Sequence, residues 1–557
     1  MADKEYDVVF VGGGQKAIVA AMYLTKYGGM KVCLFEERHE LGTGWSSEEP
    51  AGGYVGNTCS AGHIGWYQGP LYRDFPEFED YGARYAYTNC ATGTIFDDQS
   101  CIIQYSAFPD VDPDQTRTAE LFARYSKKDA DTWLMLWDKA SKYWLPAMME
   151  WAYNPAKPVY EMDAMDRLCM ATPEAGIDPH WLLMTTSQIF ASIFEHPKIQ
   201  MYAHRCCQSY GFSADDQAMG WTALLSIMTW FPYACYVVGG THALTHAAFR
   251  IIAENGGEAK TSCKVDKILI EGNRAKGIRL ADGTEIAAKY VVTNVDPFQL
   301  IFNLIGADKV DDVIARKLNA LSRDWTTIMW YSWALTERPR FTCEDTVPEV
   351  AYCGALGFGG EASKGDINTF VKESADRRAK IWPKFLNGLY MYQGYQPGSS
   401  CNFDQCMAPP DDPEKNFRLQ TEQFVLPAWS RSDDEWKAIE KKHADDMIKE
   451  IAKYAPNVSW DIVNGYVPVT PNFTSGFARN YGPSGNQHVI ENFPSQAGKF
   501  RPIPELAGHR VPGIEGLYCT GTAWHCHGFA HCAQGYNVYK VMAGDLGLKK
   551  PWEGYAY

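Results

Sequence analysis

Residues 6–45 read YDVVFVGGGQKAIVAAMYLTKYGGMKVCLFEERHELGTGW and contain the most informative pattern of the chain. Asp7–Val11 is short, apolar and β-branched, which predicts a buried parallel strand. A G-x-G-x-x-A turn follows at once. Gly12 permits the tight turn, Gly14 lets the backbone approach a pyrophosphate, and Ala17 lets a helix pack closely on the strand. This order predicts a turn that binds a dinucleotide.

A helix and a second strand complete the same unit. The helix predicted over Ala17–Tyr27 points its N-terminus, with free N–H groups and the positive end of its dipole, at the phosphate position. The strand predicted over Lys31–Phe35 ends in Glu36, about 20 residues past the glycines, where a carboxylate can bind a ribose. An acid at this position favours an unphosphorylated ribose, as in FAD or NAD, over NADP.

The composition describes a large folded protein with a small-molecule partner. The chain has 557 residues, of which 46% are hydrophobic and 21% are charged, as in globular proteins with more than one domain. Its net charge of −15 argues against nucleic acid as a partner. Aromatic residues make up 14% of the chain, and we expect them to line an apolar or flat substrate cavity.

The N-terminus and the cysteines predict a cytoplasmic protein. The first residues, MADKEYD, are acidic and run straight into the first strand, so we predict no signal or transit peptide. The 16 cysteines are then expected to be reduced thiols, most of them small buried hydrophobic residues.

One long stretch carries no Asp, Glu, Lys or Arg. It runs from Gln217 to Phe249, and Trp221–Val238 is mostly apolar. We predict a buried helix that lines a pocket, followed by a strand. A surface that dips into a membrane is the alternative, so peripheral membrane contact stays open. Pro232 and the glycine pair after it argue against a spanning helix.

Further elements follow from hydrophobic periodicity and turn residues. We predict helices over Ala119–Tyr153, Ala243–Glu254 and Asp433–Lys453, and strands over Glu258–Val265, Lys267–Glu271, Ala275–Leu280, Glu285–Thr293 and Thr326–Leu335.

The C-terminal region contains a second strand–turn–helix. Gly516–Gly521 is predicted to be a strand, and a helix is predicted over Asn537–Leu546. Between them, three of the 13 histidines lie within the seven residues 525–531, with two cysteines nearby.

The histidine cluster has three interpretations. His527 and His531 match the H-x3-H spacing of metal sites, although we predict no metal here. The histidines can also be purely structural. The third interpretation is an acid/base pair, since histidine titrates near neutral pH.

Several motifs together resemble the phytoene desaturase-like branch of FAD-dependent oxidoreductases, which includes carotenoid desaturases, carotenoid isomerases and retinol saturases. The N-terminal block above is similar to the opening of this family, and VVGGTHAL and AKGIRLADGTEI are similar to its central motifs. Gly516–Asn537 aligns without gaps to its C-terminal motif. Thr43 departs from the family pattern, as do Cys526, His527, Phe529, His531 and Cys532, which stand where the family has Pro or Gly.

The resemblance implies an α/β fold with two interleaved domains. A Rossmann-type FAD-binding domain would take residues 1–75, 236–320 and 490–557. An α+β substrate domain, with an antiparallel sheet and helices, would take residues 76–235 and 321–489. The family motifs place the following residues at FAD: Gly12, Gly14, Ala17, Glu36, Arg38, Gly44, Trp45, Val265, Gly521, Thr522 and Gly528.

The resemblance also implies a flavoenzyme, for which we considered three functions. The first is desaturation or saturation of a carbon–carbon bond in an apolar substrate, isoprenoid or aromatic. Hydride would pass to or from flavin N5. His527 or His531 would exchange the proton, and His525 would lie near the ribityl or pyrophosphate region. The alternative is a redox-neutral isomerase or hydratase that uses reduced FAD. The third is a carrier of apolar molecules that binds FAD structurally.

A second nucleotide fingerprint would indicate an NAD(P) site and thus a source of electrons. Gly357-Phe358-Gly359-Gly360 lacks the strand–turn–helix context of one. We therefore expect the electrons to be exchanged with oxygen, a quinone or another carrier, or the net reaction to be redox-neutral.

Overall fold

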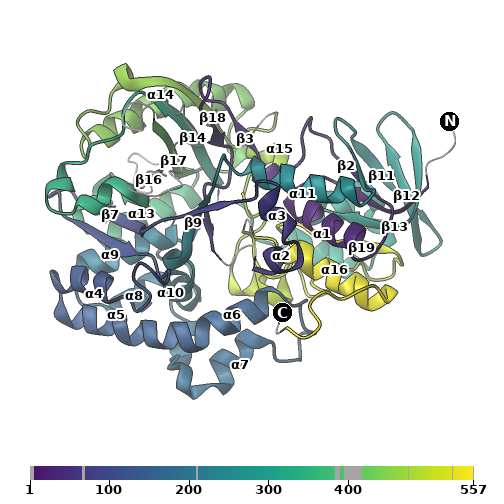
Figure 1. Cartoon of the computed structure of the whole chain (residues 1–557), viewed down its shortest axis with the longest axis horizontal. Coiled ribbons are helices and arrows are strands. Elements are labelled where there is room, and N and C mark those ends of the chain that lie inside the picture. Colours follow the sequence, from purple (N-terminus) through teal and green to yellow (C-terminus); the bar gives the residue numbers. More distant parts are fainter. Residues whose placement is uncertain are drawn as a thin grey trace.

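The fold combines two sheets with helices and is known from a computed structural model (Figure 1). It describes residues 5–65, 69–208, 211–325, 327–382, 389–393, 417–474, 476–529, 531–555 and 557.

The first sheet is built around the dinucleotide-type unit. Its strands are β1 (Tyr6–Val11), β2 (Val32–Phe35), β10 (Glu258–Lys260), β11 (Val265–Glu271), β12 (Arg274–Leu280), β13 (Glu285–Thr293) and β19 (Leu517–Cys519). The order is β10-β2-β1-β13-β12-β11, and β19 also pairs with β13. Strands β10, β2, β1, β13 and β19 pair in parallel, whereas β11, β12 and β13 form an antiparallel meander. The predicted Rossmann-type α/β fold is therefore confirmed.

One pair of predicted strands needs correction. We predicted strands over Glu258–Val265 and Lys267–Glu271, but β10 ends at Lys260 and β11 begins at Val265. After three residues beside β2, the chain turns back. The backbone N–H of Ser262 then donates to the carbonyl of Arg38 and that of Cys263 to the carbonyl of Glu36. This loop therefore covers the end of β2 instead of extending the sheet.

Three helices pack together on the first sheet, α1 (Gln15–Lys26), α11 (His242–Glu254) and α16 (Ala533–Leu546) (Figure 1). Helix α16 begins four residues before the predicted start at Asn537. Gly535 lies where α16 crosses α1, and a Cβ there would overlap the carbonyl of Lys16. The C-terminal helix can therefore approach the N-terminal helix closely.

The second sheet has seven strands in the order β18-β14-β17-β16-β15-β7-β8. They are β7 (Cys90–Ile95), β8 (Cys101–Tyr105), β14 (Thr327–Leu335), β15 (Cys353–Phe358), β16 (Leu389–Gln393), β17 (Phe417–Val425) and β18 (Val463–Val469). All pairs are antiparallel except β7 with β15. The predicted antiparallel sheet is therefore confirmed apart from one parallel pair, and the strand predicted over Thr326–Leu335 is β14.

Helices accompany the second sheet. The predicted helix over Asp433–Lys453 is α14 (Asp433–Ala452), which begins with a capping box formed by Ser432 and Glu435. The remaining helices are α2 (Gly69–Asp74), α3 (Glu77–Asp80), α4 (Thr116–Ala123), α5 (Lys127–Lys139), α6 (Leu145–Ala152), α7 (Ala164–Ala171), α8 (Thr186–Ile193), α9 (Pro197–Gln208), α10 (Gly220–Thr229), α12 (Asp312–Asn319), α13 (Ile367–Arg378) and α15 (Phe477–Tyr481).

The helix predicted over Ala119–Tyr153 is interrupted between α4 and α5. Ser126 accepts a hydrogen bond from the backbone N–H of Asp129 and so caps a new helix. Trp133 and Trp144 are fully buried, so the tryptophan stripe belongs to the core.

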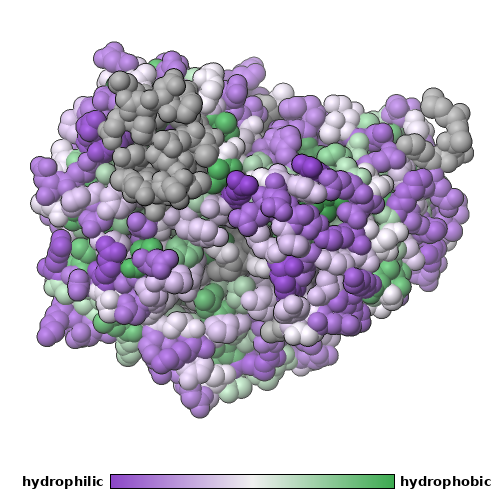
Figure 2. All heavy atoms as spheres, viewed as in Figure 1, coloured by the Kyte–Doolittle hydropathy of each residue, from purple (hydrophilic) through white to green (hydrophobic). Residues whose placement is uncertain are grey.

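The uncharged stretch from Gln217 to Phe249 contains α10 and then β9 (Ala234–Val237). Nine of the ten residues of α10 are buried, which confirms the predicted buried helix followed by a strand. In the described part of the chain, no helix is long and apolar enough to cross a bilayer. On the face seen in Figure 2, hydrophilic side chains predominate and apolar ones form small scattered patches.

The predicted domain limits can be compared with the sheets. All strands of the first sheet lie within residues 1–75, 236–320 and 490–557, and all strands of the second lie within 76–235 and 321–489. A small third sheet crosses the limits, because β9 pairs with β5 (Gly62–Ile64) and β6 (Tyr85–Tyr87). The exact limits stay a prediction.

Candidate active site

A cavity of about 640 Å³ extends from the first sheet to the second. One end lies at the dinucleotide-type turn and includes Gly12, Gly14, Glu36, Arg38 and Val265. The other end is largely aromatic and apolar, and includes Ile64, Trp230, Phe231, Tyr236 and Phe529. The volume lies within the range of roughly 300–1,000 Å³ that is usual for small-molecule sites.

Backbone geometry joins the acid of β2 to the glycine turn of β1. Gly12 has a φ of +90°, which favours glycine. The carboxylate of Glu36 accepts hydrogen bonds from the backbone N–H groups of Gly13, at 2.7 Å, and Arg38, at 2.8 Å. Glu36 therefore holds the turn in shape and lines the cavity at the same time.

Two polar atoms at this end suit a ligand rich in hydroxyl groups. Among the described residues, Gln15 Oε1 and Asn294 Oδ1 are buried without a hydrogen-bond partner, and both residues line the cavity. Buried acceptors without a partner are costly, so such atoms call for a donor from a ligand or water. The ribityl chain and ribose of a flavin dinucleotide carry hydroxyl donors of this kind.

The structure brings most of the predicted FAD residues to the cavity. Those that line it are Gly12, Gly14, Glu36, Arg38, Gly44, Val265, Thr522 and Gly528. Ala17, Trp45 and Gly521 do not, although each is buried close by. Their contact with FAD stays a prediction.

The three predicted catalytic histidines lie outside the cavity wall. His525 is turned away, with its Nε2 3.0 Å from the carbonyl oxygen of Trp151. The ring of His527 packs against Trp230 and Phe529, at centroid distances of 5.1 and 4.5 Å. Both of those residues line the cavity, so His527 lies in a second layer behind them. The catalytic roles of the histidines therefore stay predictions.

His527 and His531 form a buried pair. Burial lowers the pKa of each imidazole well below its usual value, so both are neutral at physiological pH. Nδ1 of His531 accepts a hydrogen bond from the backbone N–H of Ala533 at 3.2 Å, so the proton of the neutral ring is on Nε2. That nitrogen lies 3.4 Å from Nδ1 of His527.

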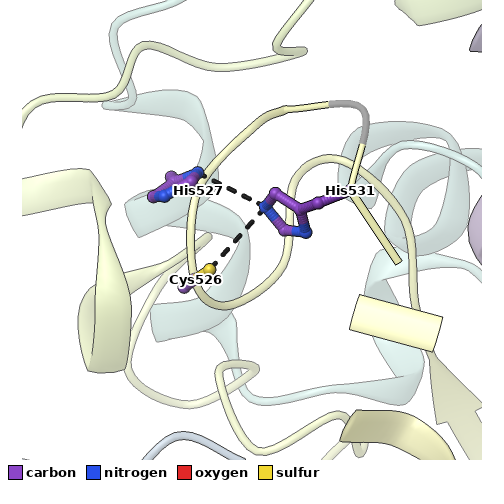
Figure 3. A group of neighbouring side chains, drawn as sticks. All are labelled: Cys526, His527 and His531. Atoms are coloured by element: carbon purple, nitrogen blue, oxygen red, sulfur yellow. Dashed lines mark hydrogen bonds between the residues drawn. The ribbon is translucent and has the colours of Figure 1, made fainter. Parts of the chain in front are cut away.

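Cys526 completes this cluster (Figure 3), in which His531 lies within hydrogen-bonding range of both other residues. The three candidate ligand atoms lie within 4.8 Å of one another, a spacing that could accommodate a metal ion. Metal binding through His531 Nε2 would require the proton to move to Nδ1, where it would face the N–H of Ala533. This contact supports the prediction of no metal, which metal analysis can test.

A buried arginine, missed in the sequence, holds the C-terminal turn in place. The guanidinium of Arg501 donates to the carbonyl oxygens of Thr522, His488, Glu491 and Gln496. Its donors therefore connect the 488–496 segment to the turn after β19.

Gly528 lies directly beneath this arginine. A Cβ at Gly528 would come within 2.8 Å of the Arg501 guanidinium and within 2.7 Å of the His488 side chain. No side chain larger than hydrogen fits there without a shift of its neighbours. This packing explains the glycine that the C-terminal motif has at position 528.

Three further cavity residues escaped the sequence analysis: Lys16, His63 and His488. Lys16 stood at an unspecified position of the glycine fingerprint, where a basic side chain beside the turn was the available signal. The two histidines are far from any motif in the sequence, so only the fold brings them to the cavity.

Comparisons with known proteins agree with this geometry. The domain family described as NAD(P)-binding Rossmann-like domain matches residues 11–78. A limonene dehydrogenase polypeptide from Castellaniella defragrans is 23% identical over 99% of this chain and 96% of its own length. The lycopene-forming phytoene desaturase from a Paracoccus species is 23% identical over 52% of this chain and 51% of its own length.

The resemblance to phytoene desaturase-like flavoproteins is confirmed. A solved structure of a putrescine oxidase variant has the same fold, with a TM-score of 0.57 and 12% identity over 97% of this chain and 98% of that one. The chain is thus similar in sequence to a limonene dehydrogenase polypeptide and to a phytoene desaturase, and it shares its fold with a putrescine oxidase.

Proposed function

We propose that the protein binds FAD and oxidises or reduces a carbon–carbon bond in a small apolar substrate. The observation that carries this proposal is the shared cavity. Its two ends, the dinucleotide-type turn and the aromatic wall, belong to one continuous cavity. A ligand on the aromatic wall would therefore lie next to a cofactor held by the turn.

The residues at the first end suit FAD. Glu36 would bind the adenosine ribose, the Gly12–Gly14 turn and the N-terminus of α1 would face the pyrophosphate, and Val265 would contact the adenine. The unpaired side-chain oxygen of Asn294 would accept a hydrogen bond from a hydroxyl group of FAD. When bound, FAD supplies the capacity to accept or donate a hydride equivalent.

The residues at the second end suit an apolar substrate. Ile64, Trp230, Phe231 and Phe529 offer large apolar surfaces, and burying such surface against a ligand contributes about 25 cal/mol for each Å². One relative that aligns along nearly the whole chain is named as part of a limonene dehydrogenase. That name favours a small isoprenoid alkene as substrate. The cavity volume also favours it over a long polyene, because a cavity of about 640 Å³ has to hold both cofactor and substrate.

The alternative is a redox-neutral reaction, in which reduced FAD assists isomerisation or hydration of a conjugated double bond. One observation favours it. Groups that can carry protons, among them Lys16, His63 and His488, line the same cavity. Proton transfer without net electron transfer would use such groups in the same way.

Anaerobic mixing tests the proposal. The FAD-loaded protein is mixed without oxygen with small isoprenoid alkenes and with their more saturated analogues, and the visible absorbance of the flavin is followed. We expect bleaching with the saturated member of one pair and a product that has lost two hydrogen atoms by mass spectrometry.

Other outcomes separate the alternatives. A product of unchanged mass, or one that has gained water, formed with only catalytic amounts of reductant, would support the redox-neutral reaction. A product that has gained oxygen but has no new carbon–carbon double bond would contradict the proposal. Absence of any spectral change or product with every candidate would contradict both.

A further inference from the structure

Lys16 is a buried basic residue in the wall of the candidate active site. It is the second residue of α1, directly after the glycine turn, and only 3% of its surface is exposed. It lines the cavity, and its Nζ donates to the carbonyl oxygen of Phe529 at 2.8 Å. Because Phe529 lies between His527 and His531, Lys16 connects the N-terminal turn to the histidine-rich turn.

Lys16 has no acidic partner in the described part of the chain. None of the ion pairs found there includes Lys16, and the Phe529 contact accounts for one of the three ammonium hydrogens. An ammonium buried without a carboxylate is costly, so burial favours the neutral amine. Burial lowers the pKa of Lys16 from 10.5 to about 7.

Three thiols that face Lys16 contribute little negative charge. Cys59 comes from the loop after β4 (Gly56–Asn57), and Cys526 and Cys532 come from the C-terminal turn. Burial raises the pKa of Cys59 to about 11 and that of the other two to about 12. All three are therefore protonated near neutral pH and leave the charge of Lys16 uncompensated.

The nitrogen groups that face Lys16 also favour its neutral form. His63, His488 and His531 have pKa values lowered by burial, so they are neutral near pH 7 and add no negative charge. Burial lowers the pKa of Arg501 to about 9, so its guanidinium stays positive and opposes a second charge on Lys16. Arg501 therefore disfavours the ammonium of Lys16, and the three neutral histidines do not compensate its charge.

We propose that Lys16 is the catalytic acid/base of this site, in place of His525, His527 and His531. The inference rests on the proposed function and assigns its proton-transfer step. Lys16 reaches the cavity directly, beside the residues of the nucleotide turn and opposite Phe529, whereas the three histidines lie behind the wall.

Protons and electrons balance in both directions of the reaction. In desaturation, one carbon of the substrate loses a hydride to the oxidised cofactor and its neighbour loses a proton. The neutral amine of Lys16 takes that proton and becomes an ammonium. The electron pair of the C–H bond that lost the proton forms the new double bond. In the reverse direction, the ammonium would return the proton to carbon, and the hydride would come from the reduced cofactor.

Rapid mixing of the FAD-loaded protein with substrate tests this role. In the wild type, the rate of flavin reduction should rise with pH and level off above the pKa of Lys16, which burial lowers from its usual value, because the neutral amine is the base. Lys16→Met keeps an unbranched side chain, one atom shorter and without the amine, and should bind FAD, yet lower the rate by about 10²–10⁴-fold and remove the pH dependence. Lys16→Arg should be similarly slow, since a guanidinium does not release its proton.

Lys26→Met is the matched control. Lys26 lies at the other end of α1 and pairs with Glu77 at the surface. Its variant should reduce flavin at the wild-type rate. If Lys16→Arg also kept the wild-type rate and pH profile, Lys16 would act only as a fixed positive charge, and the proposal would be wrong.

A second measurement needs no substrate. The Lys16 amine is followed by NMR in FAD-loaded protein with isotope-labelled lysine, and Lys16→Met assigns its signal. A titration clearly below the ordinary lysine value of 10.5 supports the role, whereas titration near 10.5 overturns it even if the wild type turns over. A wild type that binds FAD but reacts with no alkene overturns the proposed function instead, so the two failures are distinguishable.

Discussion

The side-chain amide of Asn294 packs against Gly14 so closely that a Cβ on Gly14 would overlap its nitrogen. Asn294 follows β13 and Gly14 follows β1, two neighbouring parallel strands. The contact therefore joins the ends of these strands at the nucleotide end of the cavity. Gly14 serves this packing as well as the backbone approach for which its motif is known.

Gly14→Ala should impair FAD binding. The added methyl group displaces Asn294, and such overpacking costs about 1–3 kcal/mol. If this cost falls on FAD binding, we expect a loss of affinity of about 5- to 150-fold in a fluorescence titration. Gly544→Ala in α16 is the control, because a Cβ there meets no atom within 4 Å, and its affinity should be that of the wild type. Equal affinities of the two variants would contradict the packing argument.

Glu36→Gln should weaken the glycine turn. The carboxylate accepts two backbone N–H groups, and an amide can accept only one of them without presenting its own N–H to the other. We expect a loss of about 1–3 kcal/mol in the free energy of unfolding, together with weaker FAD binding. Urea unfolding checks the first effect. Exposed Glu48→Gln should change neither quantity, and a stable Glu36→Gln protein would argue against this role.

Buried histidines should make the protein acid-sensitive. The pKa values of His527 and His531 are lowered in the folded state, so below about 6.5 the unfolded chain binds protons that the folded one does not. Stability should then fall by about 1.4 kcal/mol per histidine for each pH unit below that value. Urea unfolding at pH 7.5 and 5.5 measures this loss.

Replacing one histidine of this pair isolates its share. His531→Gln should have a smaller stability difference between the two pH values than the wild type. His180→Gln removes an exposed histidine and should leave the difference unchanged. A His531→Gln variant with the full wild-type difference would show that this imidazole is protonated in the folded protein.

The Cys526, His527 and His531 cluster should not retain zinc. The Ala533 N–H occupies Nδ1 of His531 and keeps the proton on Nε2, the atom that would have to bind the metal. After dialysis against a chelator, elemental analysis should find far less than one zinc ion per chain. Stoichiometric zinc that disappears in a folded Cys526→Ser variant would contradict this expectation.

The nucleotide-binding half of the fold was predictable from local patterns. The strand, glycine turn, helix and acid of residues 6–45 lie close together in the sequence, and each residue type has one clear physical reason. The β11–β13 meander was visible because its turn residues and apolar alternation are also local.

The second sheet was mostly hidden, because its strands bury polar residues. In β17, Arg418, Gln420 and Glu422 occupy alternate positions, a pattern that predicts a solvent-exposed face, yet all three are buried. Gln420 is satisfied by the carbonyl of Asn57, a contact across 363 residues. The role of Lys16 was hidden for the same reason, since its partner Phe529 is 513 residues away.

The content of bound flavin tests the central claim most directly. The purified chain, incubated with FAD and freed of excess cofactor, is denatured, and the released chromophore is identified by its absorbance and mass. The account predicts about one FAD per chain, lost in Gly14→Ala and kept in Gly544→Ala. A colourless protein that takes up no flavin would contradict it.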